Sequence, residues 1–318
     1  MTKVLISTST FAEYDRSPLD VLKESGFEPV MNPYGRTLRE HELRALARGA
    51  AGLIAGTERL DGPVLGEMRG LKIISRCGAG LENIDLDAAK RLGMAVYNTP
   101  SGPTLAVAEL TVALLLNLAR RITEMDREVR KGVWRKSAGS LLRGKKVGII
   151  GFGRIGRKVA ALLLPFGAEI RYFDPCRDES DSGCSPSDIG ELLAWADAVT
   201  VHASLASPCM KLLGWRELSL MKEGAALVNT SRGGVVDEAA LYEALSSGRL
   251  SGAALDVFEE EPYRGPLAAL PNVILTPHIG SYARETRSEM EMEAVSNLLK
   301  GFGLACLRTG PEKGAGRS

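Results

Sequence analysis

The stretch "GIIGFGRIG", residues 148–156, lies near the middle of this 318-residue chain and decides how the rest of it is organised. The apolar run "VGII" comes before the turn and "RKVAALLLPFG" follows it, so the expected order is strand, turn and helix. Gly151, Gly153 and Gly156 give the spacing GxGxxG, which lets the backbone approach a pyrophosphate at a helix N-terminus. A surface glycine loop can show the same pattern, but the flanking strand and helix favour a dinucleotide site.

Asp174 supports this interpretation, because it ends the next strand-like run, 18 positions after Gly156. A carboxylate at that place binds the ribose hydroxyls of the adenosine half. It would also repel a 2′-phosphate, so the sequence predicts NAD rather than NADP. Arg177 lies close to Asp174 in the sequence and weakens that preference a little.

Strand-like runs alternate with helical runs on both sides of the glycine turn. Amphipathic stretches such as "LREHELRALARG" and "DLDAAKRLG" separate the apolar runs and end in glycine, as helices commonly do. The alternation predicts two doubly wound α/β domains with parallel sheets. The expected strands are 3–7, 27–31, 51–56, 71–77 and 94–98, then 145–151, 169–174, 198–203, 225–231, 252–258 and 273–278.

The late position of the glycine turn predicts that one domain is inserted into the other. Six strands from the glycine turn onward suffice for a Rossmann cofactor domain, which we expect over residues 100–280. Residues 1–99 and the C-terminal helix and tail, 281–318, should then form a flavodoxin-like substrate domain. Two domains also fit the chain length, since a single core rarely exceeds about 250 residues.

Composition narrows the classes of function. The formal net charge of +1 argues against a broad nucleic-acid-binding surface. Five scattered cysteines without a CxxC pair fit thiols in a cytoplasm rather than disulfides or a metal site. The N-terminus "MTKVLISTSTF" lacks the apolar core of a signal peptide. We expect the longest apolar stretch, Leu105–Ala119, to be a buried helix that is too short and too polar to span a bilayer.

Reactive side chains follow three of the predicted strands. "NTSRGGVVDEAAL" contains Arg232, "ALDVFEEEP" contains the carboxylates 259–261, and "LTPHIGS" contains His278. Ligands of an open parallel sheet bind beyond the carboxyl ends of its strands, so these groups are expected to face one crevice. An arginine grips a carboxylate, a histidine exchanges a proton, and a glutamate orients the imidazole and favours its charged form. The set suits oxidation of a 2-hydroxy acid or reduction of a 2-keto acid.

Taken in order across nearly the whole chain, these segments resemble the signatures of the D-isomer-specific 2-hydroxyacid dehydrogenase family. The resemblance implies that Arg232, Glu261 and His278 are catalytic. We interpret the neighbouring Glu259 and Glu260 as solvated surface charges. NAD is the implied cofactor. Further cofactor contacts implied by the family are Arg154, Ile155, Thr230, Ser231, Asp256, Gly280 and Ser281.

The two other histidines have less specific interpretations. His202 ends a strand where the family commonly has a histidine near the cofactor without a catalytic role. His41 lies in a polar helix and is expected to be exposed. The family also implies a homodimer, with the helix from Thr104 to about Arg120 in its interface.

The segment "SRCGAGLENID", residues 75–85, resembles the part of the family that faces the substrate. Its glycine-rich turn would present the N–H groups of Gly78, Ala79 and Gly80 to the substrate carboxylate. Arg76 is the variant typical of phosphoglycerate dehydrogenases and would bind a second anionic group, although it could equally be a surface arginine.

Two departures leave the substrate open. Biosynthetic phosphoglycerate dehydrogenases often have "NTPNGN" where this chain has Pro103 in "NTPSGP", and "LIAGTERL" lacks the arginine that follows their third strand, although Arg59 is near. The expected substrate is 3-phosphoglycerate or a related anionic acid, and hydroxypyruvate or glyoxylate is the alternative. A non-enzymatic NAD-sensing corepressor is the alternative of another class. The chain ends soon after its last helix, so feedback through a C-terminal regulatory module is not expected.

Overall fold

The computed structural model describes residues 1–176, 183–203 and 211–304, and it divides the chain into two compact units. Unit 1 contains Met1–Pro103 and the chain from Tyr282 onward, and unit 2 contains Thr104–Ser281. The divisions at 103/104 and 281/282 lie within four residues of the expected domain ends. Both units are α/β with parallel sheets, as the alternation of strands and helices indicates.

Unit 1 is built on a five-stranded parallel sheet in the order β2-β1-β3-β4-β5, the order of flavodoxin-like folds. All five strands coincide with expected apolar runs. The strands are β1 (Thr2–Ile6), β2 (Phe27–Met31), β3 (Ala50–Ala55), β4 (Ile73–Arg76) and β5 (Ala95–Asn98). The helices are α1 (Ser17–Glu24), α2 (Glu40–Leu46), α3 (Gly62–Glu67), α4 (Leu86–Arg91) and α11 (Arg284–Gly301).

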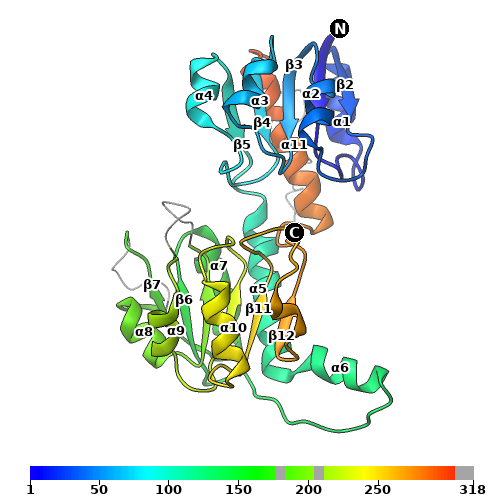
Figure 1. The fold of residues 1–318 in the computed structure, drawn as a ribbon. Coiled ribbons are helices and arrows are strands. Elements are labelled where there is room, and N and C mark those ends of the chain that lie inside the picture. The colour runs from blue at the N-terminus through cyan, green and yellow to red at the C-terminus, as the bar shows by residue number, and fades with distance from the viewer. Residues whose placement is uncertain (177–182, 204–210, 305–318) are drawn as a thin grey trace, which may run out of the picture. The chain divides into compact units, whose positions relative to one another are not determined.

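Both faces of this sheet are covered, because successive side chains of a strand point to opposite faces. Val4 and Ile6 of β1 pack in the same cluster as Leu22 of α1 and Leu298 of α11. Leu5 packs on the other face with residues of α2, α3 and α4. The C-terminal helix α11 thus covers one face of a sheet whose strands all lie in the first hundred residues, which explains why unit 1 contains both ends of the chain (Figure 1).

Unit 2 has a seven-stranded parallel sheet in the order β12-β11-β10-β9-β6-β7-β8. Numbered from the glycine turn, this is the Rossmann order 3-2-1-4-5-6 with one further strand. The strands are β6 (Lys146–Ile150), β7 (Glu169–Phe173), β8 (Ser185–Pro186), β9 (Ala198–Val201), β10 (Ala226–Asn229), β11 (Gly252–Leu255) and β12 (Val273–Leu275). The helical segments are α5 (Pro103–Arg120), α6 (Ile122–Arg130), α7 (Arg154–Leu163), the 3₁₀ turn Leu164–Phe166, α8 (Ile189–Trp195), α9 (Trp215–Leu220), α10 (Glu238–Ser246) and the 3₁₀ turn Pro266–Ala269.

The expectation of six strands in this unit was incomplete, because β8 was not expected. It has only two residues and ends in proline, so it has neither the length nor the alternation that marks a strand in a sequence. Its pairing with β7 at the edge of the sheet, Arg171 with Ser185, is what defines it.

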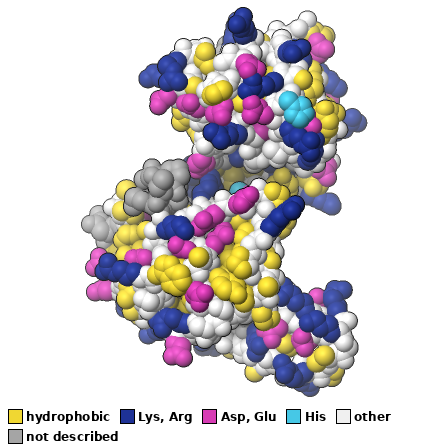
Figure 2. Space-filling view, viewed as in Figure 1, with side chains coloured by type: hydrophobic (Ala, Val, Ile, Leu, Met, Phe, Trp, Pro, Cys, Tyr) yellow, Lys and Arg dark blue, Asp and Glu magenta, His cyan; other side chains and the backbone are white. Residues whose placement is uncertain are grey.

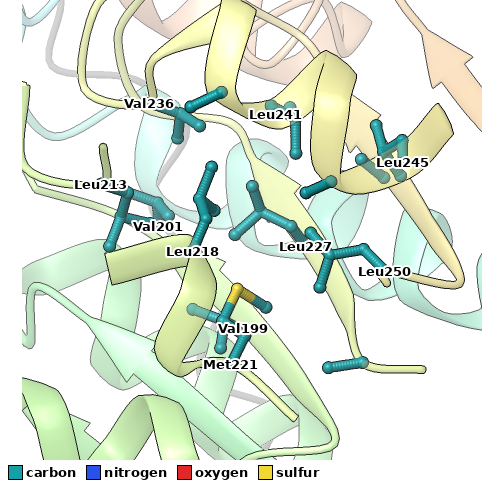
Figure 3. Packing of buried hydrophobic residues seen from close by; sticks show 14 of the residues in the cluster. Val199, Val201, Leu213, Leu218, Met221, Leu227, Val236, Leu241, Leu245 and Leu250 are labelled. Carbon is teal, nitrogen blue, oxygen red and sulfur yellow. The ribbon is translucent and has the colours of Figure 1, made fainter. Parts of the chain in front are cut away.

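The two faces of the unit 2 sheet carry separate hydrophobic cores. Figure 3 shows one of them, where Leu218 of α9 and Leu241 of α10 lie over Val201 and Leu227 of the sheet. On the other face, α5 and α7 pack against β6, β10 and β11 through residues such as Val112 and Val159. These cores hold the strand ends, where the reactive residues lie, in fixed positions.

Helix α5 is longer than the apolar stretch from which it was expected. Over its 18 residues it has a mean hydropathy of 1.3, so its length and composition would allow a membrane span, contrary to our expectation from the sequence. Only 44% of it is buried within the structure. Ala108, Val112 and Leu115 pack into the unit 2 core, whereas Leu105 is 49% exposed. It is therefore a core helix with one uncovered side, rather than the fully buried helix that was expected.

Residues 121–141 form an arm that leaves the body of unit 2 after α5 (Figure 1). No residue of α6 is buried. Regular structure is absent from Val133 to Ser140, and Trp134 is 84% exposed. Figure 2 shows Lys and Arg side chains gathered along this arm, which includes Arg127, Arg130, Lys131, Arg135 and Lys136.

Candidate active site

The glycine turn joins β6 to α7 in the strand–turn–helix arrangement that the sequence predicted. A Cβ atom added at Gly156 would lie 2.1 Å from the carbonyl oxygen of Gly151, so helix and strand can pack this closely only with glycine there. Gly151 has a φ of +90° and also lies against the backbone of His202. Around Gly153 there is open space, because a Cβ would meet nothing within 4 Å.

The N-terminus of α7 offers donors beside this open space. The first bond within the helix runs from the Arg157 N–H to the Gly153 carbonyl. The N–H groups of Arg154, Ile155 and Gly156 donate to no acceptor in the described ranges. Unpaired amides at the positive end of a helix are suited to a phosphate group, so these residues fit the pyrophosphate of a dinucleotide.

Asp174 lies beside the same turn. Its Oδ2 accepts a hydrogen bond from the Phe152 N–H at 2.7 Å, and its Oδ1 accepts one from the Cys176 N–H at 2.9 Å. These bonds fix the half-buried carboxylate beside the glycines, where it could meet a ribose. Arg177, which was expected to modify the preference for NAD, lies outside the described residues.

Arg232 follows β10 in a turn that lies directly against the segment after β11. A Cβ added at Gly233 would lie only 1.7 Å from the Phe258 carbonyl oxygen. The Asn229 side-chain amide donates to the Arg232 carbonyl, and Arg232 Nη1 donates to the Ser231 carbonyl at 2.8 Å. These contacts hold the arginine close enough for its charge to help lower the pKa of Glu261.

Glu261 and His278 form a pair. The Nδ1 atom of His278 lies 2.9 Å from Oε2 and 3.1 Å from Oε1 of Glu261. Partial burial opposes ionisation of Glu261, but hydrogen bonds from His278 and the Phe258 N–H, with the nearby positive charges, lower its pKa below the ordinary value. An ionised Glu261 only accepts hydrogen bonds, so Nδ1 carries a proton and Nε2 is the atom left to exchange one.

The remaining predicted cofactor residues of unit 2 lie at the same carboxyl edge but differ in what they contact. Thr230 is buried, and its hydroxyl pairs with Thr111 of α5 at 2.9 Å. The Ser231 hydroxyl donates to Asn229 Oδ1 at 2.7 Å. Asp256 is 1% exposed and binds the segment 276–280, which includes Gly280. Ser281 is half-buried and ends the unit.

The predicted substrate loop follows β4 in unit 1. A Cβ at Gly78 would fall 1.2 Å from Arg76 Nη1, so the arginine lies where any other residue would place its side chain. Arg76 Nη1 also donates to the Cys77 carbonyl at 2.5 Å. The Gly78 N–H donates to the Arg76 carbonyl at 3.0 Å, so the expectation that it is offered to the substrate was wrong. The N–H groups of Ala79 and Gly80 donate to no acceptor within the part of the chain that the structure describes. The loop thus combines an arginine with two available amides.

The other two histidines have different surroundings from His278. His202 is half-buried, and desolvation of its imidazole lowers its pKa to about 3, while its Nε2 lies 3.1 Å from the Thr200 hydroxyl. It is therefore neutral and is unsuited to exchange a proton at pH 7. His41 is exposed on α2. Among the described residues, no group of three or more His, Cys, Asp or Glu side chains could hold a metal ion.

Three residues near the site were not singled out from the sequence. Thr111 holds Thr230, Gly233 permits the close approach to Phe258, and the hydroxyl of Thr276 bonds to Asp256. Thr276 had a signal, because it is a polar residue directly after a strand, and Gly233 had one as part of the glycine pair after Arg232. The contacts of Thr111 and Gly233 are with residues more than twenty positions away.

Comparison with known proteins agrees with this geometry. Residues 112–280 match the family model described as D-isomer specific 2-hydroxyacid dehydrogenase, NAD binding domain. The chain is 43% identical over 257 residues to a glyoxylate reductase of Aeropyrum pernix, covering 76% of this chain and 77% of that protein. It is 38% identical to a hydroxypyruvate reductase of Thermotoga maritima, covering 79% of this chain and 84% of that protein.

A D-3-phosphoglycerate dehydrogenase of Archaeoglobus fulgidus is also similar, at 38% identity over 294 residues. The match covers 89% of this chain but only 55% of that relative, so the chain spans about half of its length. Among solved structures, the TT0316 protein of Thermus thermophilus matches with a TM-score of 0.88 at 39% identity, covering 96% of this chain and 99% of that one.

A D-lactate dehydrogenase of Aquifex aeolicus, solved with NAD and lactic acid, matches with a TM-score of 0.79 at 29% identity and 95% coverage of both chains. Fold, family model and relatives agree with the resemblance carried by the sequence motifs. The chain belongs to the D-isomer-specific 2-hydroxyacid dehydrogenase family and carries the NAD-binding domain of that family.

Proposed function

We propose that this protein is an NAD-dependent D-2-hydroxyacid dehydrogenase that interconverts a small 2-hydroxy acid and its 2-keto acid. The observation that carries the proposal is the pair of His278 and Glu261 at 2.9 Å, with the charge of Arg232 close enough to act on the same carboxylate. A protein that only sensed NAD would need the glycine turn but not this set.

Arg232, His278 and Glu261 have different roles in the proposed reaction. Arg232 binds the substrate carboxylate with its guanidinium fork and polarises the adjacent carbonyl. His278 donates a proton from Nε2 to the carbonyl oxygen during reduction, or accepts one from the hydroxyl during oxidation. Glu261 holds Nδ1 and stabilises the imidazolium. The nicotinamide, when bound, supplies or accepts the hydride.

We propose 3-phosphoglycerate, or a related acid with a second anionic group, as the substrate. Arg76 supports this choice because its guanidinium is held beside Gly78 in the loop whose Ala79 and Gly80 amides are available for a carboxylate. A second anion would find there a positive charge that a simple 2-keto acid does not need.

Hydroxypyruvate or glyoxylate is the second candidate, and Glu58 favours it. This residue lies in the segment after β3, which lacks the arginine that phosphoglycerate dehydrogenases of the family have there, and it is only 3% exposed. Burial raises the pKa of Glu58, and the charge of Arg76 acts on it in the opposite direction. Glu58 therefore adds no second positive charge beside Arg76 for a phosphate, which favours the smaller acids.

The test is NADH oxidation with a panel of 2-keto acids, comprising phosphohydroxypyruvate, hydroxypyruvate, glyoxylate and pyruvate. The highest kcat/KM for phosphohydroxypyruvate supports the first candidate, and the highest value for hydroxypyruvate or glyoxylate supports the second. NADH binding without oxidation by any member of the panel would contradict the enzyme proposal and favour the sensor.

We further propose that the protein works as a homodimer in the cytoplasm. The uncovered side of α5 and the exposed apolar side chains of the arm need a partner, and a second copy of the chain could bury both. The arm is also more basic than the chain as a whole. Its segment 127–136 carries five basic side chains and one acidic one, whereas the whole chain has a net charge of only +1. The exposed apolar residues are Leu105, Ile122, Val129, Val133, Trp134 and Leu141.

Light scattering tests the assembly. Wild type at micromolar concentration should have twice the mass of the chain, and Ile122→Glu combined with Trp134→Glu should give a monomer. A monomeric wild type would contradict the proposal.

For the compartment, the described cysteines Cys77, Cys176 and Cys184 are all thiols, which supports a reducing environment. Cell fractionation that places the protein outside the cytoplasm would refute that part.

A further inference from the structure

Asp256 accepts three hydrogen bonds from the segment that carries His278. It follows β11 directly, and the segment 276–280 follows β12. The two strands pair in parallel with Leu255 opposite Leu275, so Asp256 and Thr276 emerge side by side at the carboxyl edge.

Both oxygens of the Asp256 carboxylate accept hydrogen bonds from this segment. Oδ1 accepts from the Thr276 hydroxyl at 2.6 Å and from the Ile279 N–H at 2.7 Å. Oδ2 accepts from the Gly280 N–H at 2.8 Å. These donors lie on both sides of His278, and Asp256 is only 1% exposed, so water competes little for these bonds.

His278 itself has an unusual backbone conformation. Its φ is +54°, in the left-handed region that residues with a side chain seldom adopt and that persists only when neighbouring contacts impose it. The Ile279 and Gly280 amides, which Asp256 binds, come directly after His278. The His278 N–H also donates to the Thr276 carbonyl at 3.0 Å, so the segment closes into a tight turn.

We propose that Asp256 is a positioning residue, which holds the 276–280 turn so that the His278 imidazole meets Glu261 and points Nε2 toward the substrate. The inference rests on the proposed function for its catalytic meaning. It differs from the family expectation, in which Asp256 is a cofactor contact. Of the four lone-pair positions on the carboxylate, three are used by the turn, which leaves one on Oδ2.

The main variant is Asp256→Asn, which keeps the size of the side chain and one acceptor oxygen. Its NH₂ group cannot accept from the second oxygen position, so either the Gly280 N–H or the two donors on Oδ1 lose their partner. We expect kcat to fall by about 30- to 100-fold, since displacement of a reacting group by about 1 Å costs on that order. The dissociation constant of NADH, measured by fluorescence, should change by less than about threefold.

A second measurement does not depend on activity. The chain has three histidines, so the Nδ1–H proton of His278 bonded to Glu261 can be assigned by NMR through its loss in His278→Gln. This signal should disappear or broaden in Asp256→Asn without NAD or substrate. Because it reads only the orientation of the imidazole, it tests the inference even if no 2-keto acid is reduced.

Two further variants complete the design. Thr276→Val keeps the shape but removes one of the three donors, so kcat should fall by about three- to tenfold, and it serves as the test if Asp256→Asn does not fold. Asp197→Asn is the matched control, because Asp197 also accepts a backbone N–H, from Lys146, but lies at the opposite end of the sheet. It should leave kcat and the His278 signal unchanged.

A signal that is unchanged in both Asp256→Asn and Thr276→Val would overturn the proposal. So would an Asp256→Asn enzyme that binds NADH more than tenfold more weakly but keeps its wild-type kcat at saturating cofactor, because that result identifies a cofactor ligand.

Discussion

Replacing Gly233 with alanine should disable the site while leaving most of the fold intact. The added Cβ would lie 1.7 Å from the Phe258 carbonyl oxygen, 2.1 Å from its carbon and 2.8 Å from the Glu259 nitrogen. Real Cβ atoms essentially never lie closer than 3.0 Å to another heavy atom, so the two segments must separate by about 1.3 Å. Both neighbours are backbone atoms and cannot rotate away as the end of a side chain could.

This separation moves Arg232 away from Glu261 and His278. A displacement of about 1 Å can cost about 10²-fold in rate, so we expect kcat/KM to fall by at least about 100-fold, which corresponds to about 2.7 kcal/mol. Overpacking of this kind also costs about 1–3 kcal/mol of stability, and Tm should fall by about 2–4 °C for each kcal/mol.

The assay is NADH oxidation with the best 2-keto acid of the panel, together with thermal unfolding. Gly190→Ala is the control, because Gly190 lies in α8 and its added Cβ would meet only Leu220 at 3.9 Å. That variant should keep full activity and equal or higher stability. A Gly233→Ala enzyme with more than half of the wild-type kcat/KM would refute the reasoning.

The other predictions concern the proposed roles of single residues. Arg232→Ala should lower kcat/KM by roughly tenfold to a hundredfold, and Arg232→Lys should recover only part, because an ammonium cannot reproduce the planar fork; equal activity of the two variants would contradict this. His278→Ala should lower kcat by about 10²–10⁴-fold with little change in NADH binding by fluorescence, whereas weaker binding with normal kcat would identify a cofactor role. Glu261 has a lowered pKa, so it stays ionised even at pH values below its ordinary titration range. Glu261→Gln removes the charge that stabilises the imidazolium, so the rate of 2-keto acid reduction should fall at a lower pH than in wild type, and an unmoved alkaline limb in the pH–rate profile would exclude the pairing. Asp174→Ala should weaken NAD binding more than NADP binding, and a wild type that prefers NADPH to NADH would show that Asp174 was misread.

Much of the candidate site could be predicted because each of its parts has a local signature. The GxGxxG spacing of Gly151, Gly153 and Gly156 follows from the need to bring helix and strand backbone together, and a sequence shows that need directly. Arg232 and His278 follow apolar runs, and parallel pairing places the ends of such runs at one edge. The part that was missed depends on contacts between segments. Two examples are the close packing of Gly233 on Phe258, where an added Cβ would lie 1.7 Å from the carbonyl oxygen, and the hydrogen bonds from the His278 turn to Asp256. Neither contact produces a periodic pattern in the sequence.

The sequence by itself determined the two α/β domains, the insertion of one into the other and the residue types of the candidate site. Hydrophobic periodicity and turn chemistry act over a few residues, so they can be read without coordinates. Only the tertiary structure decided how those residues are held. Strand register brings Asp256 beside Thr276, twenty positions away, and places β8 next to β7 although it has just two residues. The uncovered side of α5 could not be predicted from the sequence either. An apolar helix has the same sequence pattern whether its own domain or another chain covers it.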